Sequence, residues 1–143
     1  MKNRFPLEVV LMLRRNAEAA QAVKLKEILE KRRGLLSELQ VVRREIEAYD
    51  AASPGACGAA EMLSARRYGE LLFRRADLLE TELRKNSIRE AERRKELLGA
   101  LKERKKMDRL KEIWALKRAR DLARAEASEM DETARTQYAR EAA

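Results

Sequence analysis

Apolar residues recur at alternating steps of three and four through the first fifty positions, which is the spacing of one buried face of an α-helix. The series that keeps this spacing comprises Leu25, Ile28, Leu35, Leu39, Val42, Ile46 and Tyr49, with Arg32 as its one polar member. Nearer the start, the same spacing continues in a different phase at Val10, Leu13, Ala17 and Ala20. The pattern predicts a first helix over about residues 6–50, with a heptad slip between Ala20 and Leu25.

One segment interrupts the helical pattern, at about residues 51–59, where Pro54, Gly55 and Gly58 lie close together. The apolar spacing resumes beyond it at Met62, Ala65, Tyr68, Leu72, Ala76, Leu79 and Leu83. Weaker matches then continue almost to the end of the chain, which predicts a second helix over about residues 60–138.

Two long helices joined by one turn predict an all-α fold, an antiparallel coiled-coil hairpin in which the second helix is longer and overhangs the first. We expect residues 1–143 to form a single coiled-coil domain. If the helices fold back around the turn, the start of the first meets the second near residues 101–105. About thirty C-terminal residues would then have no partner within the chain.

The hairpin arrangement leads to one expectation for the tyrosines near the turn and one for the glycines within the helices. Tyr49 and Tyr68 approach the turn from opposite sides, so we expect them to pack on each other. The helical glycines Gly34, Gly69 and Gly99 most simply occupy exposed positions, although each costs about 1 kcal/mol relative to alanine.

The composition argues against an enzyme. Charged residues make up 41% of the chain and aromatic residues only 4%, and there is no histidine, so the commonest general base and metal ligand is missing. The single cysteine, Cys57, lies in the predicted turn without an activating neighbour, and we interpret it as a bystander. We expect no catalytic residue, no metal and no cofactor. Without a signal-like or membrane-spanning apolar run, we expect a cytoplasmic protein.

Positive charge is concentrated in residues 84–124, which hold 16 Lys and Arg against seven Asp and Glu. At helical spacing these basic residues are expected to surround most of the helix. They indicate a partner with negative charge, or simply a solvated helix with local ion pairs. A nucleic-acid-binding basic coiled coil remains an alternative, as does a homodimeric scaffold, but the aromatic residues form no stacking platform. A membrane-surface helix is supported only by Leu110, Ile113, Trp114 and Leu116, a cluster better suited to the groove of a partner protein.

Three segments carry a resemblance to a known family. Residues 5–14, Phe-Pro-Leu-Glu-Val-Val-Leu-Met-Leu-Arg, fit an F-x-L-x-x-V-L-x-L-R opening. Residues 101–111 form a Lys-rich segment followed by Trp114, and Met130-Asp131-Glu132-Thr133-Ala134 fits an M-D-E-x-A tail. Over its whole length the chain resembles the FliJ family of flagellar type III export proteins and, more distantly, the stalk proteins of injectisomes.

The resemblance implies a non-enzymatic stalk, similar to the central stalk of rotary ATPases, at the inner face of the cytoplasmic membrane. Its implied partners are the export ATPase hexamer, the cytoplasmic domain of the export gate and the export chaperones, with membrane association only through these partners and no nucleic acid expected. The positions that fit the family's gate contact are Val42, Tyr49, Leu72, Ala76 and Leu79. As a hypothesis, the candidates for contact with acidic loops of the ATPase ring are Arg104, Lys105, Lys106, Arg109 and Trp114.

Overall fold

The computed structural model describes residues 4–52 and 58–143, and two long helices account for nearly all of them. Helix α1 spans Glu8–Ala51 and helix α2 spans Ala59–Glu141. These 44 and 83 residues confirm the predicted all-α hairpin with a longer second helix, and the described residues contain no strand. The predicted turn residues Pro54, Gly55 and Cys57 lie outside the described part of the chain.

The helix ends are defined by backbone hydrogen bonds. The amide of Glu8 donates to the carbonyl of Phe5 over 3.1 Å, so α1 begins two residues later than expected, with Glu8 placing negative charge in its first turn. At the start of α2 the carbonyl of Gly58 accepts from the amides of Glu61 and Met62, both over 3.1 Å. Helix α2 runs to Glu141, three residues beyond the prediction.

The described chain divides into two compact units. The tip unit consists of residues 19–99 and the end unit of residues 1–18 with 100–143. Each unit contains a piece of both helices. Whether the two behave as a single domain stays a prediction.

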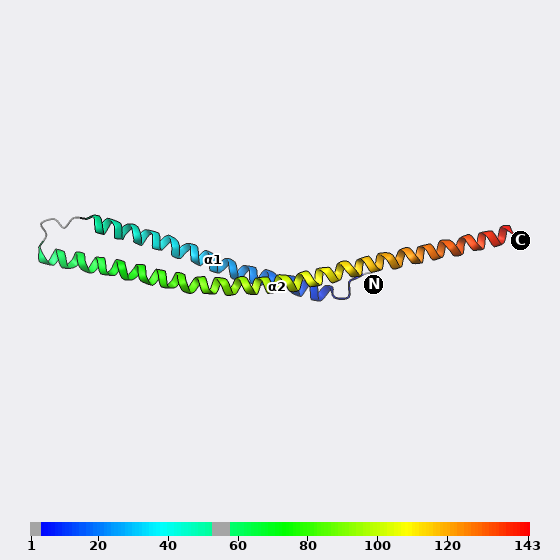
Figure 1. The fold of residues 1–143 in the computed structure, drawn as a ribbon, viewed down its shortest axis with the longest axis horizontal. Helices are drawn as coiled ribbons and strands as arrows, with labels where there is room; N and C mark the ends of the chain where they lie inside the picture. Colours follow the sequence, from blue (N-terminus) through cyan, green and yellow to red (C-terminus); the bar gives the residue numbers. More distant parts are fainter. Residues whose placement is uncertain (1–3, 53–57) are drawn as a thin grey trace. The chain divides into compact units, whose positions relative to one another are not determined.

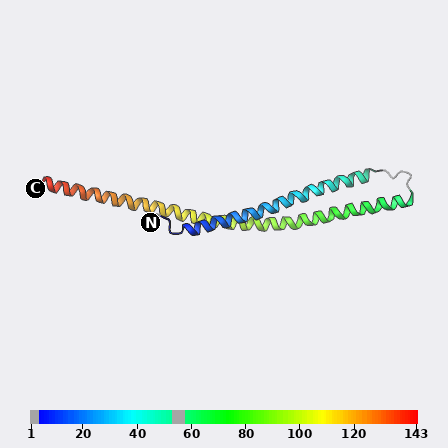
Figure 2. The same cartoon turned by 180° about the vertical axis from the view of Figure 1, so that it is seen from behind.

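In the tip unit the two helices lie side by side and antiparallel, as both views show (Figures 1 and 2). Their core is one thin layer of aliphatic side chains. It consists of Leu39, Val42, Ala76 and Leu79, with Leu35, Ile46 and Leu83 packed against it. A two-helix layer of this kind buries one stripe per helix, which leaves the opposite faces to water.

The pairing register differs from the expected one. Tyr49 packs edge-on against Tyr68, with ring centroids 6.3 Å apart, as predicted, but every residue of 59–68 is exposed and the first buried residue of α2 is Gly69. Helix α2 thus begins more than two turns before it meets α1, because the segment Ala59–Tyr68 is rich in strong helix formers. In the end unit, Glu8 binds Lys111 over 2.9 Å, so the expected meeting point near residues 101–105 is wrong. All residues of 119–143 are exposed, somewhat fewer than the thirty expected.

The expected heptad slip is also absent. Buried and half-buried positions of α1 keep one phase, from Leu11 through Glu18 and Gln21 to Leu25 and onward. The stripe at Val10, Leu13, Ala17 and Ala20 is exposed instead. Polar residues hold the seam positions here because Glu18 binds Arg104 of α2, so the periodicity of apolar residues alone pointed to the wrong face.

The expectation that the helical glycines are exposed is confirmed at Gly34 and Gly99 and is wrong at Gly69. A Cβ added to Gly34 or Gly99 would meet nothing within 4 Å. At Gly69 it would lie 2.5–2.7 Å from three atoms of the Tyr49 side chain, closer than carbon atoms pack. Gly69 is therefore a seam residue whose missing side chain makes room for the tyrosine ring.

Candidate functional site

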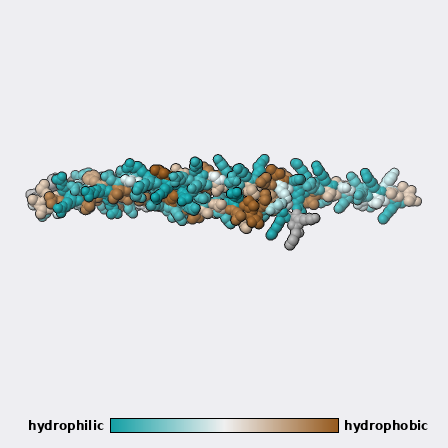
Figure 3. Space-filling view, turned by 90° about the horizontal axis from the view of Figure 1, so that it is seen from below, coloured by the Kyte–Doolittle hydropathy of each residue, from teal (hydrophilic) through white to brown (hydrophobic). Residues whose placement is uncertain are grey.

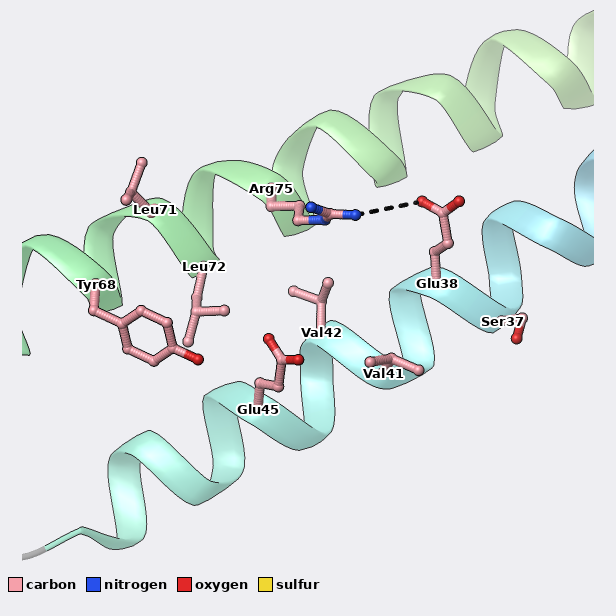
Figure 4. A pocket seen from close by; sticks show the side chains of 9 residues that line it. All are labelled: Ser37, Glu38, Val41, Val42, Glu45, Tyr68, Leu71, Leu72 and Arg75. Carbon is pink, nitrogen blue, oxygen red and sulfur yellow. Dashed lines mark ion pairs between the residues drawn. The ribbon is translucent and has the colours of Figure 1, made fainter.

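A groove on the tip unit is the first candidate for an interaction site (Figure 4). Its α1 wall presents Val41 and Glu45, and its α2 wall presents Tyr68 and Leu71, which are all exposed. Figure 4 shows Arg75 reaching across to Glu38, an ion pair of 3.9 Å at one end of the groove. The site combines an apolar lining with charges of both signs, which suits a protein partner better than a small molecule.

The predicted gate-contact residues lie under and beside this groove. Val42 and Leu72 line it, yet they are buried between the helices, as are Ala76 and Leu79 farther along the seam. Tyr49 is half-buried between Tyr68 and Gly69. Gate binding by these five residues stays a prediction. In the hairpin four of them present almost no surface, so their contribution would be to shape the groove.

A polar layer interrupts the apolar seam of the tip unit. Asn86 is buried and its Nδ2 donates to the carbonyl of Ile28 over 3.2 Å, while its Oδ1 has no partner among the described residues. One turn later, buried Glu90 accepts from Arg94 over 2.8 Å and from Arg32 over 3.1 Å. The Arg94 hydrogen bond, opposed by partial burial and reinforced by Arg32, lowers the pKa of Glu90 below its ordinary value of 4.5. Glu90 is thus the partner of Arg32, the one polar residue in the predicted seam of the first helix.

A second polar cluster lies in the end unit around Arg104, the first of the predicted ring-contact residues. Its guanidinium binds both Glu18 and Asp108, and Arg15 binds Asp108 over 3.1 Å. Hydrogen bonds to Glu18 and then to Asp108 raise the pKa of Arg104. Burial raises the pKa of Asp108, but the bonds from Arg104 and Arg15 outweigh it and keep that pKa below 3.8. Arg104 thus joins the two helices and is not freely available to a partner.

The other predicted ring-contact residues differ in their availability. Lys105 and Arg109 are exposed, and neither forms an ion pair with any residue that the structure describes. Lys106 is exposed but binds Glu103 over 2.9 Å, and this hydrogen bond lowers the pKa of Glu103. Ring contact by this set stays a prediction, and Lys105 and Arg109 are the members that combine exposure with the absence of an ion pair to any described residue.

Trp114 has a partner within the chain, contrary to the sequence-based expectation. Its ring meets Phe5 edge-on at a centroid distance of 5.8 Å, and the guanidinium carbon of Arg118 lies 5.4 Å from its ring centre. The segment before α1 therefore caps the half-buried indole. Phe5 reaches Trp114 because the helices pair in a shifted register. The expected register had placed the start of the first helix about ten residues earlier on the second, near residues 101–105.

The sequence interpretation did not identify an apolar patch at the start of α1. Figure 3 shows hydrophobic side chains gathered there. The exposed apolar residues of this segment are Leu7, Val9, Val10, Met12 and Leu13. Part of the signal was visible in the sequence as the out-of-phase stripe at Val10 and Leu13, which had been assigned to the seam.

Among residues 4–52 and 58–143, no cluster of side chains could hold a metal ion. Nor does any helix of the described chain have the length and apolarity needed to cross a membrane.

The family comparison covers the chain from end to end. The family model described as "Flagellar FliJ protein" matches residues 1–143. No curated protein and no solved structure gives a significant match. Because the family match spans the whole chain, this protein belongs to the FliJ family, whose members are components of flagellar type III protein export.

Proposed function

We propose that this chain is a stalk-like adaptor of the flagellar export apparatus. In this proposal its end unit binds the export ATPase ring, its tip unit binds the cytoplasmic domain of the export gate, and the protein escorts empty export chaperones. The observation that carries the proposal is that α2 continues from residue 119 to Glu141 with every residue exposed, so that this length of helix packs against no other segment that the structure describes.

Ring binding through the end unit rests on charge. Lys105 and Arg109 are exposed without ion pairs to described residues, so they are free to meet acidic side chains. Arg104 is omitted from the test because its reversal would break the contacts with Glu18 and Asp108.

The ring test replaces Lys105 and Arg109 by Glu and measures retention on the purified export ATPase hexamer. The matched control makes the same charge change at Arg67 and Arg74, which are exposed in the tip unit. The proposal expects the end-unit variant to bind weakly and the control to bind like the wild type, with equal helicity in both. Equal binding by the two variants would contradict it.

Gate binding rests on the exposed edge of the tip groove. Leu71 lines the groove and is 62% exposed, while Leu78 is 68% exposed and lies outside it. Leu71→Asp is expected to weaken binding to the gate's cytoplasmic domain, and Leu78→Asp to leave it nearly unchanged. A loss shared by both would indicate a nonspecific effect and would reject the groove as the gate site.

A further inference from the structure

Between Lys102 and Arg124 the basic residues of α2 divide into two sets, whereas the sequence pattern predicted that they surround most of the helix. The inward set faces the α1 segment: Arg104 binds Glu18, Lys111 binds Glu8, and Arg118 lies over Trp114. The outward set occupies positions that share the opposite side of the helix at steps of three, four and seven. We call it the basic stripe, and its members are Lys102, Lys105, Lys106, Arg109, Lys117, Arg120 and Arg124.

Most of the positive charges in the basic stripe are not paired with an acidic side chain that the structure describes. All seven side chains are exposed, and only Lys106 has an ion pair with a described residue. Four acidic residues lie in the same interval: Glu103 binds Lys106, Asp108 binds the inward set, and Glu112 and Asp121 fall at the edges of the stripe. From Lys102 to Arg124 the stripe runs for about 33 Å along the helix.

Two aliphatic side chains lie in the middle of the stripe. Ile113 is 53% exposed and Leu116 is 61% exposed, and both line a groove together with Lys117, Arg120, Arg124 and the acidic Asp121. A cluster of exposed Lys and Arg along one face of a helix is a feature of segments that bind anionic membranes, and aliphatic side chains beside such a cluster can enter the headgroup region. A nucleic acid would leave these two aliphatic groups against phosphates, and Trp114, which could stack on a base, faces Phe5 instead.

We propose that the basic stripe binds directly to the surface of an anionic lipid bilayer. This differs from the expectation that membrane association is only indirect, and it does not depend on the proposed ring or gate contacts. Each Lys or Arg held at an anionic surface strengthens binding roughly fivefold, so three of them account for about 100-fold.

The test is co-sedimentation of the full-length chain with vesicles of phosphatidylcholine alone or with a third of the lipid replaced by phosphatidylglycerol. The proposal expects binding only to the anionic vesicles, weakening as salt rises. The variant Lys117→Gln, Arg120→Gln, Arg124→Gln should lose about 100-fold in affinity. Because it keeps Lys105 and Arg109, its binding to the ATPase ring is measured separately from its binding to lipid.

The matched control removes three exposed charges from the tip unit, at Arg67, Arg74 and Arg89. It should bind the anionic vesicles nearly as well as the wild type. A second pair compares Leu116→Asp, expected to weaken binding, with Leu78→Asp, expected not to. The proposal would be overturned if the stripe and control variants lost the same affinity for anionic vesicles. It would also be overturned if the wild type bound neutral vesicles as well as anionic ones, or bound duplex DNA more tightly than anionic vesicles.

Discussion

The three helical glycines offer a direct test of the pairing register. Replacing glycine by alanine inside a helix stabilises it by about 1 kcal/mol, because alanine restricts the unfolded chain more and forms helix better. Gly34 and Gly99 have nothing within 4 Å of an added Cβ, so Gly34→Ala and Gly99→Ala should each gain that amount.

Gly69→Ala should behave in the opposite sense. Its Cβ would lie 2.5 Å from Cζ and 2.7 Å from Cε1 of Tyr49, so the ring or the helix must move. Overpacking of this kind costs about 1–3 kcal/mol, which exceeds or cancels the gain in helix propensity. The free energy of unfolding of Gly69→Ala is thus expected to lie about 1–3 kcal/mol below that of Gly34→Ala.

Urea denaturation followed by circular dichroism at 222 nm measures the difference, and Tyr49→Ala supplies the internal check. In the Tyr49→Ala background the obstacle is gone, so Gly69→Ala should become as favourable as Gly34→Ala. If Gly69→Ala raises the urea midpoint as much as Gly34→Ala does in the wild-type background, Tyr49 does not lie against Gly69 and the two helices pair in another register.

Three further predictions concern the seam. Leu11 is fully buried, so Leu11→Ala should destabilise the end unit by about 2–5 kcal/mol, whereas Leu13→Ala, at a side chain 60% exposed, should change it little; hydrogen exchange of the flanking amides separates the two. Asn86→Leu removes a buried polar group with an unpaired Oδ1 and should raise the urea midpoint, and an unchanged or lower midpoint would show that the amide is fully satisfied. The folded state lowers the pKa of Glu90, so ionised Glu90 stabilises the hairpin fully at pH values above its ordinary pKa of 4.5, and this contribution is lost as the pH falls through the lowered pKa. Glu90→Gln should therefore flatten this part of the dependence of stability on pH, measured by thermal denaturation at a series of pH values.

Much of the fold could be predicted because helix formation is local. The spacing of Leu35, Leu39, Val42 and Ile46 identifies one buried face, and the Pro-Gly segment identifies the single turn. The contact between Tyr49 and Tyr68 also follows, since both residues keep the phase of their seams on either side of that turn.

The register could not be predicted in the same way. A heptad pattern that slides by one repeat still places apolar side chains opposite apolar side chains, so periodicity leaves several alignments nearly equal. Specific shapes and charges distinguish them here: the space at Gly69 that admits Tyr49, the pair of Glu8 with Lys111, and the contact of Phe5 with Trp114. None of these pairs has a local signature, because each joins residues that are far apart in the sequence.

The candidate sites were limited by the same ambiguity. An apolar residue that packs in the hairpin core and one that binds a partner produce the same sequence pattern. For this reason the predicted contacts included four residues that the hairpin buries: Val42, Leu72, Ala76 and Leu79. For the basic residues the missing information was which side of α2 faces α1.

The polar layer of the tip unit suggests how the alternatives to this register are suppressed. Sliding α1 by one heptad would separate Arg32 from Glu90 and leave the Glu90 carboxylate facing aliphatic side chains of α1 with Arg94 as its remaining partner, which disfavours the shifted alignment. The same layer disfavours pairing α1 with a second copy of itself, because Arg32 would then face another seam without its acid. The weak apolar seam and the polar layer are therefore complementary: the first makes the helices associate, and the second selects the intramolecular partner and alignment on which the groove beside Val41 and Leu71 depends.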